Sequence, residues 1–182
     1  TLLYISYDGK LLGTITLADE VRSNSKKAIT KLRKLGVKNI IMLTGDTKQK
    51  AKMIADELGI NEVRAELLPQ DKARIVKELM NEGKKVAFIG DGINDAPALI
   101  SAHVGISMSR GADIAKATAD ISLLKDDIMA VVEAKEYANK TMNLINNNFN
   151  ATVGINSCIL AGATFGVFSP IVTAVLHNGT TI

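Results

Sequence analysis

The sequence contains one cysteine, Cys158, no tryptophan, and aromatic residues at only 4% of its 182 positions. A single cysteine excludes a disulfide-stapled scaffold. The scarcity of aromatic rings argues against the stacking platforms that bind single-stranded nucleic acids. Basic residues exceed acidic ones by 22 to 19, which is too small an excess to indicate a nucleic-acid-binding surface. We therefore expect no nucleic-acid partner.

Charge is missing altogether from the last part of the chain. Residues 141–182 contain no Asp, Glu, Lys or Arg, so every formally charged residue lies within 1–140. A water-exposed surface needs charged groups for solvation, so a stretch this long without them predicts burial in lipid. We divide the chain into a domain at 1–140 and a membrane part at 141–182. The Lys and Arg residues that precede the uncharged part place 1–140 in the cytoplasm of an integral protein of the plasma (inner) membrane.

Two apolar runs fill the uncharged part. The run at 149–168 has about the length, roughly 20 residues, that crosses a bilayer core as a helix. Ser169 and Pro170 interrupt it, and a shorter run follows at 171–182. We expect a C-terminal transmembrane helical hairpin whose second helix is truncated. The alternative is a hairpin buried at the end of a soluble domain.

Within 1–140, segments typical of strands alternate with segments typical of helices. Apolar residues at helical spacing predict helices, and short apolar runs between turn residues predict strands. The strands are expected at 11–17, 37–43, 62–66, 84–89, 104–108 and 121–124, and the helices at 23–35, 47–58, 69–83, 96–101, 114–117 and 126–147. This alternation predicts an α/β fold whose parallel sheet is covered by helices, with ligands at the carboxyl ends of the strands.

Two of the predicted strands end in Gly-Asp, at Gly45-Asp46 and at Gly90-Asp91. A glycine at such a turn lets backbone N–H groups approach an anion without a side chain in the way. Thr44 adds a hydroxyl donor immediately before the first of these turns. Taken alone, a Thr-Gly-Asp string is as often an ordinary turn as a site.

The second turn opens a stronger motif, the string GDGIND at 90–95. Its Asp91 and Asp95 are hard oxygen ligands of the kind that Mg²⁺ prefers, and the Asn94 amide can donate to a phosphoryl oxygen. Lys72 offers a compact cation that can neutralise a transferring phosphate. Together these groups predict a phosphoryl-transfer site with Mg²⁺. The G-x-G-x-x-D spacing of Gly90, Gly92 and Asp95 departs from the dinucleotide-binding fingerprint.

In this order the motifs resemble those of the P-type ATPases. Thr-Gly-Asp at 44–46, Pro-x-x-Lys at 69–72, GDGINDAPAL at 90–99 and the segment 105–115 match that family over nearly the whole chain. The resemblance implies a haloacid-dehalogenase-like phosphorylation domain that uses ATP and Mg²⁺. It implies phosphate- and cofactor-binding roles for Thr44, Gly45, Lys72, Gly92 and Asn94, Mg²⁺-binding roles for Asp91 and Asp95, a loop-ordering role for Asp46, and a place near the phosphorylation site for Asp19 of the element Asp19-x-x-Arg22.

The aspartate that this family phosphorylates lies in a DKTGT motif, and the sequence contains no such string. The family's ATP-cradling domain, which normally precedes a stretch like 1–17, is missing as well. We therefore expect a C-terminal piece of a longer pump that forms no aspartyl phosphate by itself, since covalent catalysis needs its nucleophile. The alternatives are a soluble phosphatase of the same fold and a non-catalytic Mg²⁺-binding regulatory module.

The uncharged part bears candidate ligands for a transported ion. The segment 90–108 is most similar to the heavy-metal subgroup of the family, whose last two membrane helices carry metal ligands. At those positions this chain has Asn156, His177 and Asn178, which are our candidate ligands. It lacks the Tyr-Asn pair and the Met of the copper members, and the Lys and Asp-containing motif of the zinc and cadmium members. A hydrogen bond to a neighbouring helix is the alternative role for His177. Imidazole and oxygen ligands suit a divalent ion better than Cu(I), so Zn²⁺, Co²⁺, Mn²⁺ or Cd²⁺ is expected. Which of these is transported, in which direction, and in what oligomeric state are questions that the sequence leaves open.

Overall fold

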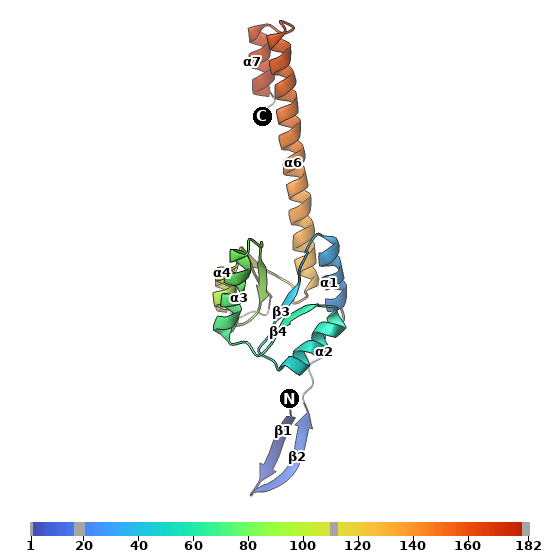
Figure 1. Ribbon diagram of the computed structural model, residues 1–182, viewed down its shortest axis with the longest axis vertical. Coiled ribbons are helices and arrows are strands. Elements are labelled where there is room, and N and C mark those ends of the chain that lie inside the picture. Colours follow the sequence, from blue (N-terminus) through green and yellow to red (C-terminus); the bar gives the residue numbers. More distant parts are fainter. Residues whose placement is uncertain (1, 17–20, 110–112, 180–182) are drawn as a thin grey trace. The chain divides into compact units, whose positions relative to one another are not determined.

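The computed structural model describes residues 2–16, 21–109 and 113–179 of the chain. These residues form two compact units, Thr1–Val132 and Glu133–Ile182, which are described separately (Figure 1). The boundary that we drew at residue 140 on the basis of charge falls inside the second unit.

The first unit begins with an antiparallel hairpin of strands β1 (Leu2–Tyr7) and β2 (Lys10–Thr16). The turn between them is formed by Asp8 and Gly9, both of which have positive φ angles, 48° and 73°. This is the backbone that two-residue hairpin turns require, and Asp-Gly is among the sequences that favour it. The sequence analysis predicted β2 but missed β1, although the Asp8-Gly9 pair carries the signal for it.

The remaining strands of the first unit are parallel and fall into two sheets. One sheet pairs β3 (Ile41–Leu43) with β4 (Glu62–Arg64). The other has the order β5 (Ala87–Gly90), β6 (Val104–Ser107) and β7 (Ile121–Ser122). The expectation of one continuous parallel sheet was therefore wrong, because no ladder of hydrogen bonds joins the two sheets within the described residues.

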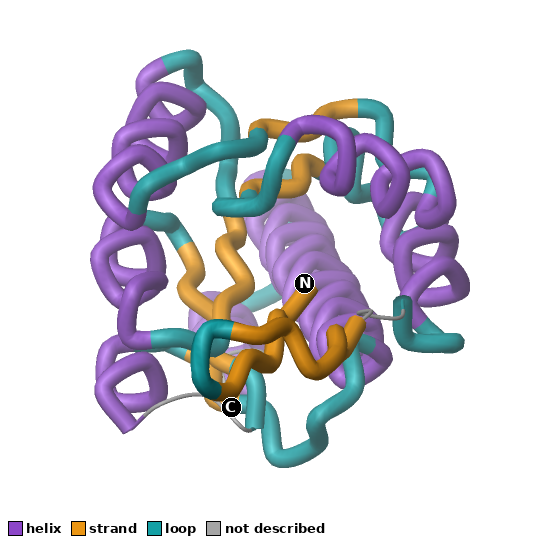
Figure 2. The backbone as a smooth tube through the Cα atoms, turned by 90° about the horizontal axis from the view of Figure 1, so that it is seen from below, coloured by secondary structure: helices purple, strands orange, loops and turns teal. Residues whose placement is uncertain are grey.

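Helices follow the strands as the alternation predicts, and in Figure 1 α1 and α2 lie on one side of the strands and α3 and α4 on the other. Figure 2 shows the same arrangement from below. The helices are α1 (Ser25–Lys34), α2 (Lys48–Leu58), α3 (Pro69–Asn81), α4 (Ala96–Ser101) and α5 (Asp113–Thr118). A short 3₁₀ turn, η1 (Ile93–Asp95), leads into α4.

Local signals explain where these helices begin and end. The Thr47 side chain accepts a hydrogen bond from the Lys50 backbone N–H at the start of α2, and Gly59 ends that helix in the left-handed conformation, with φ 70°. These are the N-cap and C-cap preferences expected of threonine and glycine. Helix α3 begins at Pro69, where the missing N–H costs nothing.

Apolar packing joins the two sheets into one domain. Leu43 of β3 packs against the buried cluster that contains Phe88 of β5 and Val76 of α3. A second cluster contains Ala28 and Leu32 of α1, Ile106 of β6, and Val131 and Val132. The strands β3 and β5 therefore border a shared core although no backbone ladder connects them.

The second unit consists of the greater part of α6 (Met129–Thr164) and of α7 (Pro170–Gly179). The long helix predicted to lead into the span at 149–168 is present, and α6 continues without interruption through most of that span. It ends at Thr164. Gly166, just beyond the helix, has a φ of 73°, and the Val167 N–H donates to the Gly162 carbonyl at 2.8 Å. Among the described residues no helix combines the length with the apolar character of a membrane span. The helical hairpin is present, and its place in a membrane stays a prediction.

Candidate functional site

The loop after β3 carries the Thr44-Gly45-Asp46 motif in a closed turn. The Asp46 backbone N–H donates to Thr44 Oγ1 at 3.1 Å, and Thr44 Oγ1 lies 3.4 Å from Asp46 Oδ2. The loop is joined to the neighbouring segment because the Leu67 N–H donates to the Thr44 carbonyl at 3.1 Å. A side chain at Gly45 would lie 3.3 Å from the Leu67 carbonyl oxygen, so the turn has little room for one. The geometry suits a carboxylate that orders the threonine loop.

Lys50 is a residue of this loop region that the sequence analysis missed. Its Nζ lies 3.3 Å from Asp46 Oδ1, one helical turn further along the chain. The i,i+4 spacing of an acidic residue and a lysine carries the signal for such a pair. Lys50 thus adds a positive charge beside Thr44 and holds the second oxygen of the Asp46 carboxylate.

Asp95 organises the turn after β5. Its Oδ1 lies 2.7 Å from Lys72 Nζ, and its Oδ2 accepts hydrogen bonds from the backbone N–H groups of Asp91 and Gly92 at 3.3 and 3.4 Å. Only 11% of the Asp95 side chain and 19% of the Lys72 side chain are exposed. Gly90 is needed here, because a Cβ at this position would lie 2.7 Å from Asp95 Cβ. Asp95 therefore fixes both the cation from α3 and the glycine turn.

Asp91 and Asn94 differ from Asp95 in that their side chains face solvent. An exposed carboxylate can take a metal ion, and Mg²⁺ commonly binds through one or two carboxylates while water and phosphate oxygens complete its shell. The described residues include no group of three His, Cys, Asp or Glu side chains that could hold a metal by themselves. The donor set therefore fits a Mg²⁺ that Asp91 holds together with a phosphate group.

Two groups of residues thus stand at the ends of two strands: the threonine loop after β3, and Lys72 with the GDGIND turn after β5. Asp19, the remaining candidate, lies outside the described residues. Its expected neighbour Arg22 donates from Nη1 to the Asp126 carbonyl at 2.7 Å and from Nη2 to Asp126 Oδ2 at 3.0 Å. The Asp126 hydrogen bond and charge raise the pKa of Arg22.

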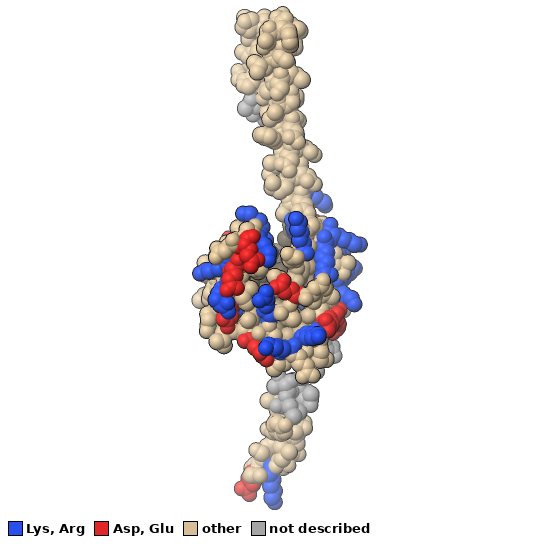
Figure 3. Space-filling view, in the orientation of Figure 1, with Lys and Arg blue, Asp and Glu red and all other residues tan. Residues whose placement is uncertain are grey.

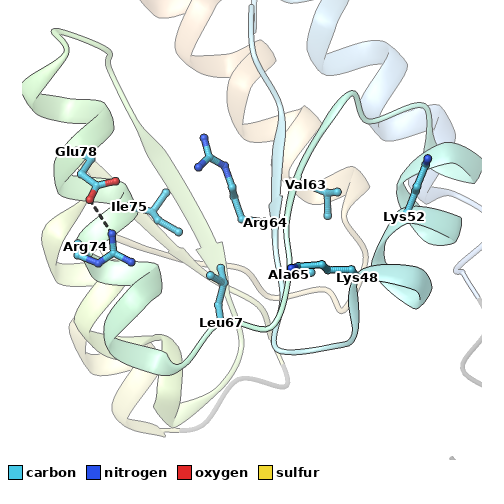
Figure 4. Close-up of a pocket in the computed structure, with 9 residues that line it drawn as sticks. All are labelled: Lys48, Lys52, Val63, Arg64, Ala65, Leu67, Arg74, Ile75 and Glu78. Atoms are coloured by element: carbon cyan, nitrogen blue, oxygen red, sulfur yellow. Dashed lines mark hydrogen bonds and ion pairs between the residues drawn. The ribbon is translucent and has the colours of Figure 1, made fainter.

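A cavity of about 430 Å³ lies between α2, β4 and α3 (Figure 4). Its lining combines apolar and charged, mostly cationic, side chains: Lys48, Lys52, Val63, Arg64, Ala65, Leu67, Arg74, Ile75 and Glu78. None of the expected site residues contributes to it. Arg74 is already engaged there, since its Nη1 donates to Glu78 Oε1 at 2.8 Å, so the cavity is not the site that the motifs indicate.

The start of α3, which carries Lys72, gives a pH-dependent prediction. The Arg74 guanidinium and the Leu68 backbone N–H, which donates to Asp71 Oδ2 at 3.0 Å, hold the pKa of Asp71 below its ordinary value. A lowered pKa stabilises the fold above the unfolded-state pKa, and this contribution disappears as the pH falls through the folded-state value. Asp71→Asn is expected to lower the Tm at pH 7, and the difference from the parent chain is expected to vanish in strong acid.

The matched control for this prediction is Glu57→Gln, which alters an exposed carboxylate on α2. It should leave the Tm unchanged at every pH. A Tm difference for Asp71→Asn that stays constant from neutral pH into acid would contradict the electrostatic explanation, because the parent carboxylate is protonated in acid.

In the second unit the structure brings two of the three expected metal ligands together. His177 Nδ1 on α7 lies 3.1 Å from Asn156 Oδ1 on α6. Asn178, which follows His177 in sequence, is exposed.

Comparisons with known proteins agree with these observations. A family model for haloacid dehalogenase-like hydrolases matches residues 3–103. Over its whole length the chain is 42% identical to a zinc-exporting P-type ATPase of Mycobacterium marinum and 43% identical to a manganese-exporting P-type ATPase of Mycobacterium leprae. Over 93% of its length it is 39% identical to a copper-exporting P-type ATPase of Bacillus subtilis. The chain spans about a quarter of the length of these curated relatives.

A comparison with solved structures identifies the same family. The crystal structure of a zinc-transporting PIB-type ATPase in its E2.Pi state superposes on 99% of the chain with a TM-score of 0.84 at 36% identity, and the chain covers 29% of that protein. The resemblance to heavy-metal P-type ATPases is thereby confirmed, as is the haloacid-dehalogenase-like α/β fold of the first unit. The chain belongs to the haloacid dehalogenase-like hydrolases, and along its whole length it is similar to one part of the heavy-metal P-type ATPases.

Proposed function

We propose that the chain is part of an ATP-driven pump for heavy-metal cations, in which it supplies the phosphate- and Mg²⁺-binding residues of the phosphorylation site. The names of the relatives support this proposal, since they include zinc, manganese and copper exporters. The positions of the motif residues support it independently, because hydroxyl, lysine and carboxylate groups stand at the ends of parallel strands.

In this proposal each residue acts on the phosphoryl group or holds a neighbour that does. The Thr44 hydroxyl, the Gly45 backbone N–H and the Asn94 amide donate to phosphoryl oxygens. Gly92, whose N–H donates to Asp95 Oδ2, keeps the phosphate side of the turn free of a side chain. Lys72 neutralises charge that develops on those oxygens. Asp91 would hold Mg²⁺, which when bound shields the charge of the phosphate. Asp46 and Asp95 act as positioning residues for Thr44 and Lys72.

The observation that most strongly supports the proposed function is the division of the parallel strands into two sheets. Site residues follow both β3 and β5, yet neither strand has a hydrogen-bonded partner on its second side within the described residues. Ile41, Met42 and Leu43 of β3 are all only half-buried, although an apolar parallel strand is normally covered on both faces. One further parallel strand between β3 and β5 would complete the sheet. It would bring its own carboxyl end, and with it the phosphorylated aspartate, between the two groups of site residues.

The second unit supplies part of the ion path in this proposal. Residues 149–168 and 171–182 enter the membrane, 1–140 remain in the cytoplasm, and Asn156, His177 and Asn178 bind the transported ion. The complete absence of charge from 141–182 supports the membrane location. The 3.1 Å approach of His177 to Asn156 supports a shared site, and its nitrogen and oxygen donors favour a divalent ion such as Zn²⁺, Co²⁺, Mn²⁺ or Cd²⁺ over Cu(I).

The test compares the chain with a longer polypeptide that includes the coding sequence upstream of Thr1. Both are incubated with labelled ATP and Mg²⁺, and acid-stable, hydroxylamine-sensitive label is counted. We expect incorporation in the longer polypeptide only, stimulation by a divalent heavy-metal ion, and loss of stimulation in His177→Ala. Release of phosphate from p-nitrophenyl phosphate by the 182-residue chain would favour a phosphatase instead. Mg²⁺ binding without either activity in both polypeptides would favour a regulatory module.

A further inference from the structure

Positive charge is concentrated in one segment of the first unit. Residues 21–45 contain seven Lys and Arg and no Asp or Glu, whereas the rest of the chain contains 15 basic and 19 acidic residues. Figure 3 shows basic and acidic side chains mixed over much of the same unit. The small net charge of the whole chain therefore conceals a strongly basic segment that includes all of α1.

Two of these seven side chains form an ion pair or a hydrogen bond with another described residue. Arg22 pairs with Asp126, and Arg33 donates to the Gly59 carbonyl at 2.6 Å. The remaining five form no ion pair with any residue that the structure describes: Lys26, Lys27, Lys31, Lys34 and Lys38. All but Lys31, which is half-buried, are exposed. We name these five residues the lysine face.

Four members of the lysine face lie on α1, away from its packed side, and the fifth, Lys38, follows the helix. Ala28, Ile29 and Leu32 are buried, and Ala28 and Leu32 belong to the same cluster as Val131 and Val132 in the first turn of α6. The apolar side of α1 is thus attached to the beginning of α6, which leaves its basic side for solvent or for a partner. Lysine side chains present compact, mobile ammonium groups, which bind phosphate as point charges without the fixed geometry of arginine.

The course of α6 indicates which partner the lysine face binds. It is one helix from Met129 to Thr164, and the chain carries no charge from residue 141 onward. At about 1.5 Å per helical residue, the distance along α6 from Val132 to Phe149 is roughly 25 Å. The chain itself therefore tethers the basic helix to the segment that we propose to enter the membrane, which raises the local concentration of the lysines at a lipid surface. Clusters of four to eight Lys or Arg next to a membrane helix are typical of binding to anionic lipids.

We propose that the lysine face of α1 is a docking surface for the anionic phosphate headgroups of the membrane leaflet that faces residues 1–140. The proposal rests on the proposed function, since it requires the second unit to enter the membrane. Docking would hold the phosphorylation domain close to the lipid surface. It would weaken with rising salt, because electrostatic attraction between exposed charges is screened beyond about 8–10 Å at physiological ionic strength.

The experiment uses the 182-residue chain reconstituted into vesicles of phosphatidylcholine alone or of phosphatidylcholine with about one third phosphatidylglycerol. Lysine acetylation by a neutral reagent is followed residue by residue with mass spectrometry. The lysine face is expected to react at least threefold more slowly in the anionic vesicles, and high salt is expected to remove the difference. Lys77 and Lys85, exposed on and after α3, are internal controls whose rates should not change. Equal rates for the lysine face in the two kinds of vesicle would overturn the proposal.

Two quadruple variants of equal charge sharpen the test. Lys26→Gln/Lys27→Gln/Lys34→Gln/Lys38→Gln removes most of the lysine face and keeps Lys31 as the reporter. Lys10→Gln/Lys52→Gln/Lys77→Gln/Lys85→Gln removes the same charge from other exposed positions. Protection of Lys31 in anionic vesicles should be lost in the first variant and kept in the second. Loss in both, with unchanged circular dichroism, would mean that net charge and not this surface is responsible.

Two further outcomes separate this inference from the proposed function. Failure of the chain to float with neutral vesicles would contradict membrane insertion, and with it the proposed function. Flotation with both vesicles without protection of the lysine face would overturn the docking surface alone. Equal protection by soluble polyglutamate in neutral vesicles would assign the surface to an acidic protein partner and would also overturn the lipid assignment.

Discussion

Replacing Lys72 by methionine is expected to lower the free energy of unfolding by about 3 kcal/mol. The Lys72 ammonium and the Asp95 carboxylate are 2.7 Å apart, and both side chains are largely shielded from water. Removal of one partner leaves a buried carboxylate without its counter-charge, whereas methionine keeps most of the length and apolar volume of the lysine. Urea denaturation should show a lower midpoint with an unchanged m-value.

The control for this prediction is Lys77→Met, because Lys77 is exposed on the same helix. That change should alter stability by no more than about 0.5 kcal/mol. Asp95→Asn added to Lys72→Met should recover part of the loss, since the uncompensated charge is removed with the carboxylate. A Lys72→Met chain as stable as Lys77→Met would show that the ion pair contributes nothing to the fold.

The same substitution tests the chemistry in the longer polypeptide. If Lys72 neutralises the transferring phosphoryl group, Lys72→Met should reduce the rate of label incorporation by about a hundredfold or more, the usual cost of one electrostatic contact with a transition state. Lys72→Arg restores the charge but not the compact ammonium group. It should recover more stability than phosphorylation activity.

Gly105→Ala is expected to destabilise the first unit by about 3 kcal/mol, at the upper end of the usual cost of overpacking. A Cβ at this position would lie 2.7 Å from the Leu99 carbonyl oxygen and 3.1 Å from the Leu99 carbonyl carbon. Both are backbone atoms, and the Leu99 side chain is itself buried, so α4 cannot yield without unpacking the core. The change can be measured by thermal and urea unfolding.

Gly13→Ala on β2 is the matched control, because a Cβ there would meet nothing within 4 Å. It should be close to neutral. Gly105→Ala should also loosen the site, since α4 continues directly from the η1 turn that carries Asp95. Equal stability of the two glycine variants would contradict the close approach of β6 to α4.

The helices of the first unit were predicted to within a few residues because their signals are local. Thr47, Pro69 and Gly59 mark helix ends through their own hydrogen-bonding groups and dihedral angles, and the apolar spacing identifies the buried faces. Strand lengths were less predictable. The predicted strand at 37–43 is only partly formed, as Ile41–Leu43, because strand length depends on a partner that is distant in sequence.

Non-local contacts account for the other differences. The strand-end rule placed the candidate residues at the ends of β3 and β5, but the pairing of Lys72 with Asp95 joins residues 23 positions apart, and no local pattern encodes it. The division of the parallel strands into two sheets was equally unpredictable, because the sequence pattern that indicates a strand does not say which other strand it pairs with. Helix α6, in contrast, passes the last charged residue, Lys140, as the predicted helix at 126–147 does, because backbone hydrogen bonds form alike in charged and uncharged sequence.

The open sides of β3 and β5 have a consequence for the chain when it is produced by itself. Unpaired N–H and C=O groups on an edge strand are a template for pairing with any other strand, including one from a second copy. The exposed apolar side chains of β1 and β2, among them Tyr4 and Leu12, add a surface that water solvates poorly. Isolated preparations should therefore self-associate as concentration rises. A synthetic peptide that pairs with the open sides of β3 and β5 should therefore reduce self-association and keep the chain in solution.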